Sequence, residues 1–287
     1  MLSSKLCIGS ANFGSVYGIR NRKPIKKSEI KKIFKFIEKK KINYLDTAFS
    51  YKNSHKIIKN YINRRVKIIT KIPRIPKKLK NIKEWLIKKI IIEQKYFKGA
   101  IDTILVHDTK DLNDKKKSKQ IFEAFSHLKK KKIIRNLGIS VYHPFELDRY
   151  IDKYNFDTVQ LPVNLFNRSF ISTNWLKKLK KRKIKIHVRS VLLQGLLASS
   201  KLLNQKKFSD LKKYSLRLNN HCKKKKISNL EYAIRYITSL SNINLIVVGV
   251  RDFKQLKEIY SAYKKKPIKA SKDLIINNKK ILDPRNW

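Results

Sequence analysis

Four residues that can exchange protons lie at or just beyond the ends of short apolar segments in this chain. Asp46 lies in segment 43–48, Tyr51 follows five residues later, Lys71 ends segment 66–71, and His107 ends segment 102–107. A carboxylate, a phenol, an ammonium and an imidazole can together hold and transfer a proton. A buried charge without a partner is costly, so a charged residue at the end of a buried strand needs an explanation. We therefore treat these residues as candidates for one catalytic site.

The four side chains suggest the reduction of a C=O group by an external hydride donor. Asp46 and Lys71 end neighbouring segments and can pair with each other. A lysine beside the Tyr51 phenol would favour tyrosinate and lower the pKa of that phenol from about 10. Tyr51 would then be a general acid for a developing alkoxide. His107, from the next segment, can donate a hydrogen bond to the same oxygen and orient the carbonyl.

Each of these residues also has a structural explanation when it is considered alone. An Asp at a strand end is often a helix cap, a Lys carries little information in such a lysine-rich chain, and a single His is more often a core residue. Several polar residues at the same position of successive strands are harder to explain in this way. The later segments continue the series with polar ends at Ser140, Gln160, Arg189 and Ser190.

Eight short, β-branched apolar segments alternate with amphipathic ones and would position these polar residues. The predicted strands are residues 5–10, 43–48, 66–71, 102–107, 134–140, 156–162, 185–190 and 244–250. Their nearly continuous apolar character is typical of parallel strands that are covered on both faces. Helical spacing lies between them, for example after the candidate N-cap Ser28, where one face carries Ile30, Ile33, Phe34 and Ile37.

This alternation predicts an α/β fold, a single (β/α)8 TIM barrel over residues 1–287 with a C-terminal tail at about 265–287. A doubly wound sheet is the alternative, but it normally has a Gly-rich fingerprint after the first strand. The stretch GSANFGSVYG lacks that spacing. Few residues precede the first strand, so we expect no N-terminal hairpin. In such barrels the chemistry lies at the C-terminal strand ends, where the polar residues fall.

The charge of the chain is extreme, with 71 Lys and Arg against 20 Asp and Glu, a formal net charge of +51. One interpretation is binding of nucleic acid or another polyanion, because neutralised phosphates release counterions. The alternative is a compositional bias toward lysine, isoleucine and asparagine. We favour the second, because the lysines are spread over successive helices and arginine is the minority. We expect no specific nucleic-acid partner.

The remaining composition indicates a globular protein of the cytoplasm. The apolar fraction is 41% and the aromatic fraction 10%, which argues against disorder. Cys7 and Cys222 are too few for a disulfide framework and fit no metal site, so we expect a reducing compartment and no metal. We recognise no signal peptide and no apolar run of membrane-spanning length. The oligomeric state stays open.

Over nearly its whole length the chain resembles the aldo/keto reductases. The stretches LDTAFSYKNS, IITK and LVHD resemble the family's Asp–Tyr, lysine and histidine segments, and LGIS, VQLPVNLF and VVGVRDFKQLKE resemble its later strands. HVRSVLLQGLL is similar to a bacterial branch of NAD(P)-dependent oxidoreductases that is often linked to sugars. The resemblance implies a catalytic tetrad of Asp46, Tyr51, Lys71 and His107, and a small-molecule carbonyl substrate.

The resemblance also implies a nicotinamide cofactor, usually NADPH, that lies extended across the barrel. Ser140 and Gln160 would contact its carboxamide, and Arg189 occupies the place of the residue that stacks on nicotinamide. The other implied contacts are Ser190, Leu192 and Gly195 at the pyrophosphate, and Gly249, Arg251 and Gln255 at the adenosine end. The Arg251 guanidinium suits a 2′-phosphate, so we favour NADPH over NADH.

Some positions depart from the family pattern. Val141 lies where many relatives have an Asn that reaches the carboxamide, and Lys52, His55 and Lys59 replace residues that are commonly Gly, Glu and Gly. A barrel with an idle, cofactor-sensing site is therefore a second alternative to the enzyme.

Three variable segments are expected to select the substrate, namely DTKDLNDKKKS after His107, residues about 196–208, and the tail 267–287. Phe13, Trp175 and Trp287 could contact a substrate, and burial in the core is at least as good an explanation for each.

Overall fold

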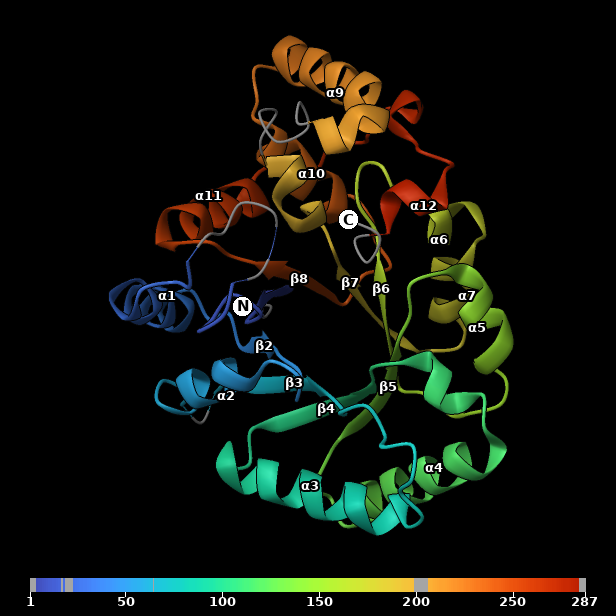
Figure 1. The fold of residues 1–287 in the computed structure, drawn as a ribbon. Helices are drawn as coiled ribbons and strands as arrows, with labels where there is room; N and C mark the ends of the chain where they lie inside the picture. Colours follow the sequence, from blue (N-terminus) through green and yellow to red (C-terminus); the bar gives the residue numbers. More distant parts are fainter. Residues whose placement is uncertain (1–3, 17, 19–22, 64, 199–205, 284–287) are drawn as a thin grey trace.

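The computed structural model is a closed barrel of eight parallel strands that follow one another in chain order, as predicted (Figure 1). It describes residues 4–16, 18, 23–63, 65–198 and 206–283. The strands are β1 (Leu6–Gly9), β2 (Tyr44–Asp46), β3 (Lys67–Lys71), β4 (Ile101–Val106), β5 (Asn136–Ser140), β6 (Thr158–Pro162), β7 (Lys185–Arg189) and β8 (Leu245–Gly249). Within the described residues, only Ser4 and Lys5 precede β1, without a hairpin.

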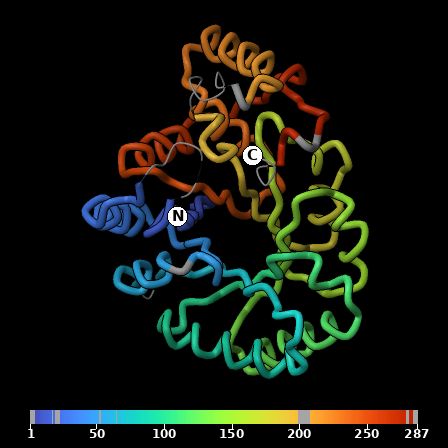
Figure 2. Tube along the Cα trace, in the orientation of Figure 1, coloured from blue at the N-terminus to red at the C-terminus, as the bar shows by residue number. Residues whose placement is uncertain are grey.

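Helices surround the barrel, and the strands follow one another around it in chain order, from blue to red (Figure 2). They are α1 (Lys27–Lys39), α2 (Lys52–Lys59), α3 (Ile82–Tyr96), α4 (Lys115–Lys130), α5 (Pro144–Tyr150), α6 (Ser169–Ser172), α7 (Trp175–Lys181), α9 (Lys212–Lys225), α10 (Asn229–Thr238), α11 (Phe253–Lys264) and α12 (Lys279–Leu282). Short 3₁₀ turns cover Thr109–Leu112, Leu193–Ala198, Lys206–Leu211 and Lys272–Leu274. Every helix in the described residues is too short or too polar to span a membrane.

Helix α1 shows how the apolar pattern builds the outer layer of the core. Its buried residues are the predicted ones, Ile30, Ile33, Phe34 and Ile37. The prediction that Ser28 caps this helix was wrong. The helix begins at Lys27, so Ser28 already has helical backbone, and Lys26 occupies the cap position without a side-chain hydrogen bond.

The inside of the barrel is filled by alternate residues of the strands. Cys7, Ile69, Leu105, Leu245 and Val247 form an apolar cluster there, separate from the layer between the strands and the helices. A barrel of this size holds packed side chains rather than a pore. The polar residues of the same inward series therefore collect at the C-terminal ends of the strands, where space opens.

The described part of the tail packs against the body of the protein. Leu274 and Ile276 are buried. The Arg168 guanidinium, at the start of α6, donates hydrogen bonds to the backbone oxygens of Ala270 (3.3 Å) and Ser271 (2.7 Å). The tail residues Ile275, Ile276, Leu282 and Asp283 line a second cavity, which also borders Arg189 and Tyr142.

His187 is a buried imidazole inside the barrel that should make the stability depend on pH. It lies on β7 beside Gln160 and Leu245, and its Nδ1 has no hydrogen-bond partner among the described residues. Burial lowers the pKa of His187 from 6.5 to about 3. Below pH 6.5 the imidazole of His187 therefore binds a proton in the unfolded chain but not in the folded protein. The free energy of unfolding falls as the pH drops toward 3.

We expect His187→Gln to flatten this dependence. One such group contributes a slope of at most about 1.4 kcal/mol per pH unit. From pH 6.5 to pH 5 the free energy of unfolding should decrease in both proteins. The decrease should be about 1–2 kcal/mol smaller in the variant than in the wild type, as measured by urea denaturation. Equal losses in both proteins would show that His187 does not titrate in this way.

Candidate active site

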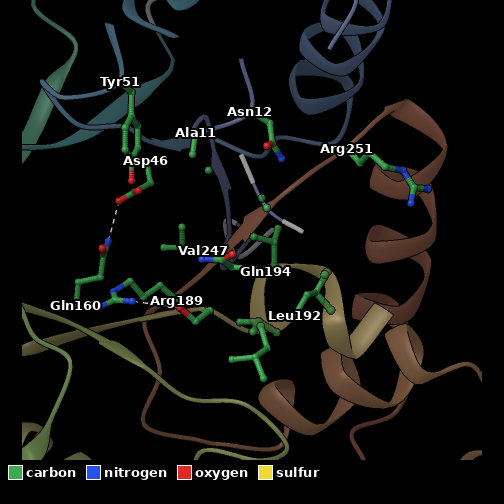
Figure 3. Close-up of a pocket in the computed structure, with 18 of the residues that line it drawn as sticks. Ala11, Asn12, Asp46, Tyr51, Gln160, Arg189, Leu192, Gln194, Val247 and Arg251 are labelled. Atoms are coloured by element: carbon green, nitrogen blue, oxygen red, sulfur yellow. Dashed lines mark hydrogen bonds between the residues drawn. The ribbon is translucent and has the colours of Figure 1, made fainter. Parts of the chain in front are cut away.

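One cavity at the C-terminal ends of the strands collects the predicted site residues (Figure 3). Its volume is about 1130 Å³, including its open mouth. It is lined by Asp46, Tyr51, Lys71, His107, Ser140, Gln160, Arg189, Ser190, Leu192, Gly195, Gly249, Arg251 and Gln255, which are all of the residues proposed from the sequence. The structure thus brings them together, while the roles assigned to them stay predictions.

A buried ion pair lies at the floor of this cavity. Lys71 Nζ is 2.6 Å from Asp46 Oδ1 and 2.8 Å from the backbone oxygen of Thr47. Asp46 Oδ2 accepts a hydrogen bond of 2.7 Å from Gln160 Nε2, which is the dashed line in Figure 3. Lys71 and Asp46 are each nearly inaccessible to solvent. The carboxylate that ends β2 is therefore compensated by a cation from β3 and an amide from β6.

Tyr51 is held in place by the segment that follows it. It is the N-cap residue of α2, and its backbone nitrogen donates to the Ala48 oxygen at 2.9 Å. The Ser54 hydroxyl donates to the backbone oxygens of Ser10 (2.6 Å) and Phe13 (2.8 Å), which ties α2 to the loop after β1. That loop must approach closely, since a Cβ on Gly14, which has φ +76°, would lie 2.7 Å from Asn53 Cβ.

The pKa of Tyr51 differs from the prediction. Burial, with a further contribution from the Asp46 carboxylate, raises the pKa of the phenol above its ordinary value of 10. The expectation that Lys71 would lower it is wrong for this structure. Lys71 Nζ lies 5.8 Å from the centroid of the Tyr51 ring, and its charge is balanced by Asp46. At neutral pH the phenol is protonated, which is the state that a proton donor needs.

His107 directly follows β4 and is neutral at pH 7. Burial, assisted by the positive charges of Lys71 and Arg189, lowers the pKa of His107 to about 4. A neutral imidazole carries one N–H donor and one acceptor nitrogen. It can therefore donate a hydrogen bond to a carbonyl oxygen without bringing a charge of its own.

Gln160 can form a further hydrogen bond through its side-chain oxygen. Its amide nitrogen is used by Asp46, while its Oε1 is buried and has no hydrogen-bond partner among the described residues. A buried acceptor without a partner is uncommon and calls for a ligand or a water. An N–H donor such as a carboxamide would satisfy it.

The loop after β7 has an unusual backbone. Ser190 (φ 57°), Leu193 (φ 46°) and Gln194 (φ 52°) are non-glycine residues in the left-handed region, and Gly195 follows with φ 96°. Residues held in such conformations cluster at functional sites, where the surrounding structure compensates their cost. The loop lines the same cavity.

Arg251 lies far from Tyr51 across the cavity, just before α11 (Figure 3). Its Nε is 2.9 Å from Asp252 Oδ2, and its backbone nitrogen donates to Gln255 Oε1 at 2.8 Å. The side chain of Gln255 is thus committed to shaping this turn. An anion placed here would meet the guanidinium of Arg251 near the N-terminus of a helix.

The residues after Tyr51 that depart from the family pattern still form a regular helix. Lys52–Lys59 is α2, and Nδ1 of His55 within it lies against the carboxylate of Glu93 in α3. The imidazole also packs edge-on against Phe97, with ring centroids 5.0 Å apart. The local segment is therefore anchored to α3 by a contact that the sequence pattern did not predict.

Three polar lining residues were missed at the sequence level. Tyr142, Asn12 and Gln194 border the cavity. Asn12 Nδ2 donates to the Val250 oxygen at 2.9 Å, which joins the loop after β1 to the end of β8. Asn12 lies in GSANFG, a polar turn that directly follows a strand, and that position was the available signal.

The aromatic residues considered for the substrate have other positions. Phe13 is fully buried and lies 6.0 Å from Phe34, centroid to centroid. Trp175 is 3% exposed in α7, with Lys178 Nζ over its ring. Both are core residues. Trp287 lies outside the described residues, as do residues 199–205 and 284–287 of the predicted substrate segments.

Comparison with known proteins decides the family. The model of the aldo/keto reductase family matches residues 5–276. The chain belongs to the aldo/keto reductase family. A holo-form aldo-keto reductase of Bacillus halodurans, AKR11C1, superposes with a TM-score of 0.74 at 20% identity, covering 93% of this chain and 88% of that one. PA4992 of Pseudomonas aeruginosa gives a TM-score of 0.66 at 15% identity, with 91% and 90% covered. At these identities the two structures show the shared fold.

One curated relative matches a shorter stretch of this aldo/keto reductase family member. The protein named uncharacterized oxidoreductase YqkF of Bacillus subtilis strain 168 is 25% identical over 148 residues, which cover 48% of this chain and 48% of that protein. The match thus spans about half the length of that relative. The family and the fold support an oxidoreductase that acts on carbonyl groups.

The cavity fits the nicotinamide dinucleotide that the family implies. Its charged lining residues are Asp46, Lys71, Arg189 and Arg251, so positive charge is in excess, as a cofactor with phosphate groups requires. The unpartnered Gln160 Oε1 matches a carboxamide donor. In the described parts of the chain, no group of three or more His, Cys, Asp or Glu side chains could hold a metal ion.

Proposed function

We propose that this protein is an NAD(P)H-dependent reductase of an aldehyde or ketone, with sugars among the candidate substrates, or that it catalyses the reverse oxidation. The observation that carries the proposal is the meeting of Tyr51, His107 and the Lys71–Asp46 pair in one cavity with the unpartnered Gln160 acceptor. Reduction of a C=O group by a nicotinamide cofactor requires a proton donor for the oxygen and a hydrogen-bond acceptor for the carboxamide of the cofactor. An idle, cofactor-sensing barrel is the alternative that the assays below exclude or establish.

The roles of the residues follow from their protonation states. The bound cofactor would supply a hydride to the carbonyl carbon, and Tyr51 would supply the proton to the carbonyl oxygen. Neutral His107 would donate a hydrogen bond to that oxygen and fix the direction of the carbonyl. Lys71, whose Nζ lies 5.8 Å from the Tyr51 ring centroid, would partly offset the cost of the tyrosinate that forms as the proton leaves, while burial and Asp46 still keep the pKa of the phenol above 10.

The raised pKa of Tyr51 gives the two directions different pH dependences. Reduction uses the protonated phenol, which persists up to and beyond pH 10, so the reduction rate should stay nearly flat from pH 6 to 9. Oxidation uses the tyrosinate, so its rate should rise with pH over the same interval. Initial rates in both directions test this. A reduction rate that falls steeply above pH 7 would contradict the assignment.

Arg251 is proposed to select NADPH over NADH. Its ion pair with Asp252 engages Nε, and the two Nη atoms are the ones that a 2′-phosphate would meet. Hydrogen bonds to charged groups contribute about 1.5–3 kcal/mol. Arg251→Ala should therefore weaken NADPH by about tenfold or more and leave NADH nearly unchanged.

Dissociation constants from fluorescence titration measure this selectivity. Lys257→Ala is a matched control, because Lys257 is an exposed cation of α11, the helix that begins just after Arg251, and does not line the cavity. If Arg251→Ala weakened the binding of NADPH and NADH equally, Arg251 would not recognise the 2′-phosphate.

We also propose a cytoplasmic location, which the two free, buried cysteines Cys7 and Cys222 support. The primary test of the function is an NADPH fluorescence titration followed by a panel of aldehydes, ketones and sugars. Binding of NADPH with turnover of at least one carbonyl compound is the expected result. Binding without turnover of any compound would favour the idle barrel.

A further inference from the structure

Arg189 ends β7 and presents a guanidinium that no carboxylate of the described residues neutralises. The guanidinium carbon lies 4.0 Å from the centroid of the Tyr142 ring. Nη2 donates to the backbone oxygen of Val141 at 3.0 Å, and Nη1 donates to Ser190 Oγ at 3.1 Å. A ring, a carbonyl and a hydroxyl hold the group in place without cancelling its charge. Among the described residues, no Asp or Glu forms an ion pair with it.

The other charges around the cavity are balanced. Lys71 is paired with Asp46 at 2.6 Å, and Arg251 is paired with Asp252 at 2.9 Å. His107 is neutral at pH 7, because its pKa is about 4. The excess positive charge of the cavity is therefore centred on Arg189.

A nicotinamide ring in this cavity must come near that charge. Hydride transfer brings the ring to about 3–3.5 Å from the carbonyl carbon, whose oxygen is within hydrogen-bond reach of Tyr51. Arg189 lines the same cavity as Tyr51 and His107, and its charge opposes the rise in the pKa of Tyr51 and helps to lower the pKa of His107. The reacting ring would thus lie inside the electric field of the guanidinium, in a site partly shielded from water.

The ring changes its charge during the reaction, being neutral when reduced and singly positive when oxidised. We propose that Arg189 makes the site discriminate between the two states of the cofactor, so that it binds the reduced form tightly and repels the oxidised form. This inference rests on the proposed function. Its consequence is that the site favours carbonyl reduction and promotes release of the oxidised cofactor after each turnover.

The two forms of the cofactor carry the same phosphates and the same adenosine, so a comparison of their affinities isolates the charge of the ring. We expect NADPH to bind wild-type protein at least about tenfold more tightly than NADP⁺. For a two-electron couple, a tenfold ratio raises the midpoint potential of the bound cofactor by about 30 mV.

The test measures both dissociation constants by isothermal titration calorimetry for the wild type, Arg189→Gln and Arg189→Lys. In Arg189→Gln, which keeps a donor for the Val141 carbonyl but loses the charge, the ratio should fall toward one. In Arg189→Lys, which keeps the charge, the ratio should stay well above one. For wild-type protein alone, the ratio should also decrease with added salt, because screening weakens the repulsion.

Tight binding of both forms with a wild-type ratio near one would overturn the inference and leave the proposed function intact. A high ratio that Arg189→Gln does not change would also overturn it. Failure of both forms to bind would overturn the proposed function, and the inference with it.

Discussion

Replacing Tyr51 with phenylalanine is expected to lower kcat for carbonyl reduction by about 10²–10⁴-fold, the usual contribution of a positioned general acid. The substitution removes only the hydroxyl, so the ring stays in place beside Asp46 and Lys71. In the proposed reaction the hydroxyl acts on the substrate oxygen in the transition state, while the cofactor would be held by other strand ends. The dissociation constant for NADPH should therefore remain nearly unchanged.

A second Tyr→Phe substitution provides the control. Tyr61 stacks on Phe34 with ring centroids 5.0 Å apart and does not line the cavity. Tyr61→Phe should keep both kcat and NADPH affinity. Near-normal turnover of a good aldehyde by Tyr51→Phe would show that the assignment of the proton donor is wrong, whatever the fold.

Lys71→Met should be comparably severe for activity and should also destabilise the protein. The change removes the cation that lies 2.6 Å from Asp46 Oδ1 and the donor to the Thr47 oxygen. Removing one partner of a buried ion pair typically costs about 3–5 kcal/mol, because the other charge is left uncompensated. The tyrosinate formed during reduction would lose its neighbouring cation as well, so kcat should fall by about 10²-fold or more.

The double variant separates these two effects. Asp46→Asn with Lys71→Met removes both charges, so part of the lost free energy of unfolding should return, while activity should stay low. Asp46→Asn alone should reduce kcat less than Lys71→Met does, since the lysine remains. Urea denaturation and initial rates are compared among the wild type, the two single variants and the double variant. Recovery of activity in the double variant would contradict the role of Lys71.

The fold was predictable because its signal is local and repeated. The strands are short apolar runs, and several of them end in a polar residue, as β3 does with Lys71 and β7 with Arg189. Parallel strands in chain order bring such ends to one mouth, so the position of the site follows from the same pattern. All of the proposed residues accordingly line one cavity.

Other features depend on three-dimensional contacts that no local pattern carries. The pKa of Tyr51 is set by burial and by Asp46, and both effects exceed that of a lysine whose charge is already balanced. Gln160 bonds to Asp46 across the barrel, over 114 positions of sequence. The helix start at Lys27 rather than Ser28 depends on backbone conformation, which residue preference only biases.

The stacking of Tyr142 on Arg189 also depends on three-dimensional contacts rather than on a local pattern. Tyr142 follows β5 and Arg189 ends β7, so their contact exists only once these strands have assembled with β6 between them. Arg189 was placed at the cofactor by resemblance, but its uncompensated charge could be recognised only from the absence of an ion pair in the described structure.

The most direct test of carbonyl reduction at this cavity is a single-turnover experiment with NADPH that carries deuterium at the transferable position of the nicotinamide. The wild-type protein should consume one NADPH for each alcohol formed from a reactive aldehyde, with the deuterium on the former carbonyl carbon. Tyr51→Phe should bind the same cofactor and form little or no deuterated alcohol. Alcohol without deuterium, or no consumption of NADPH with any carbonyl compound, would contradict the account.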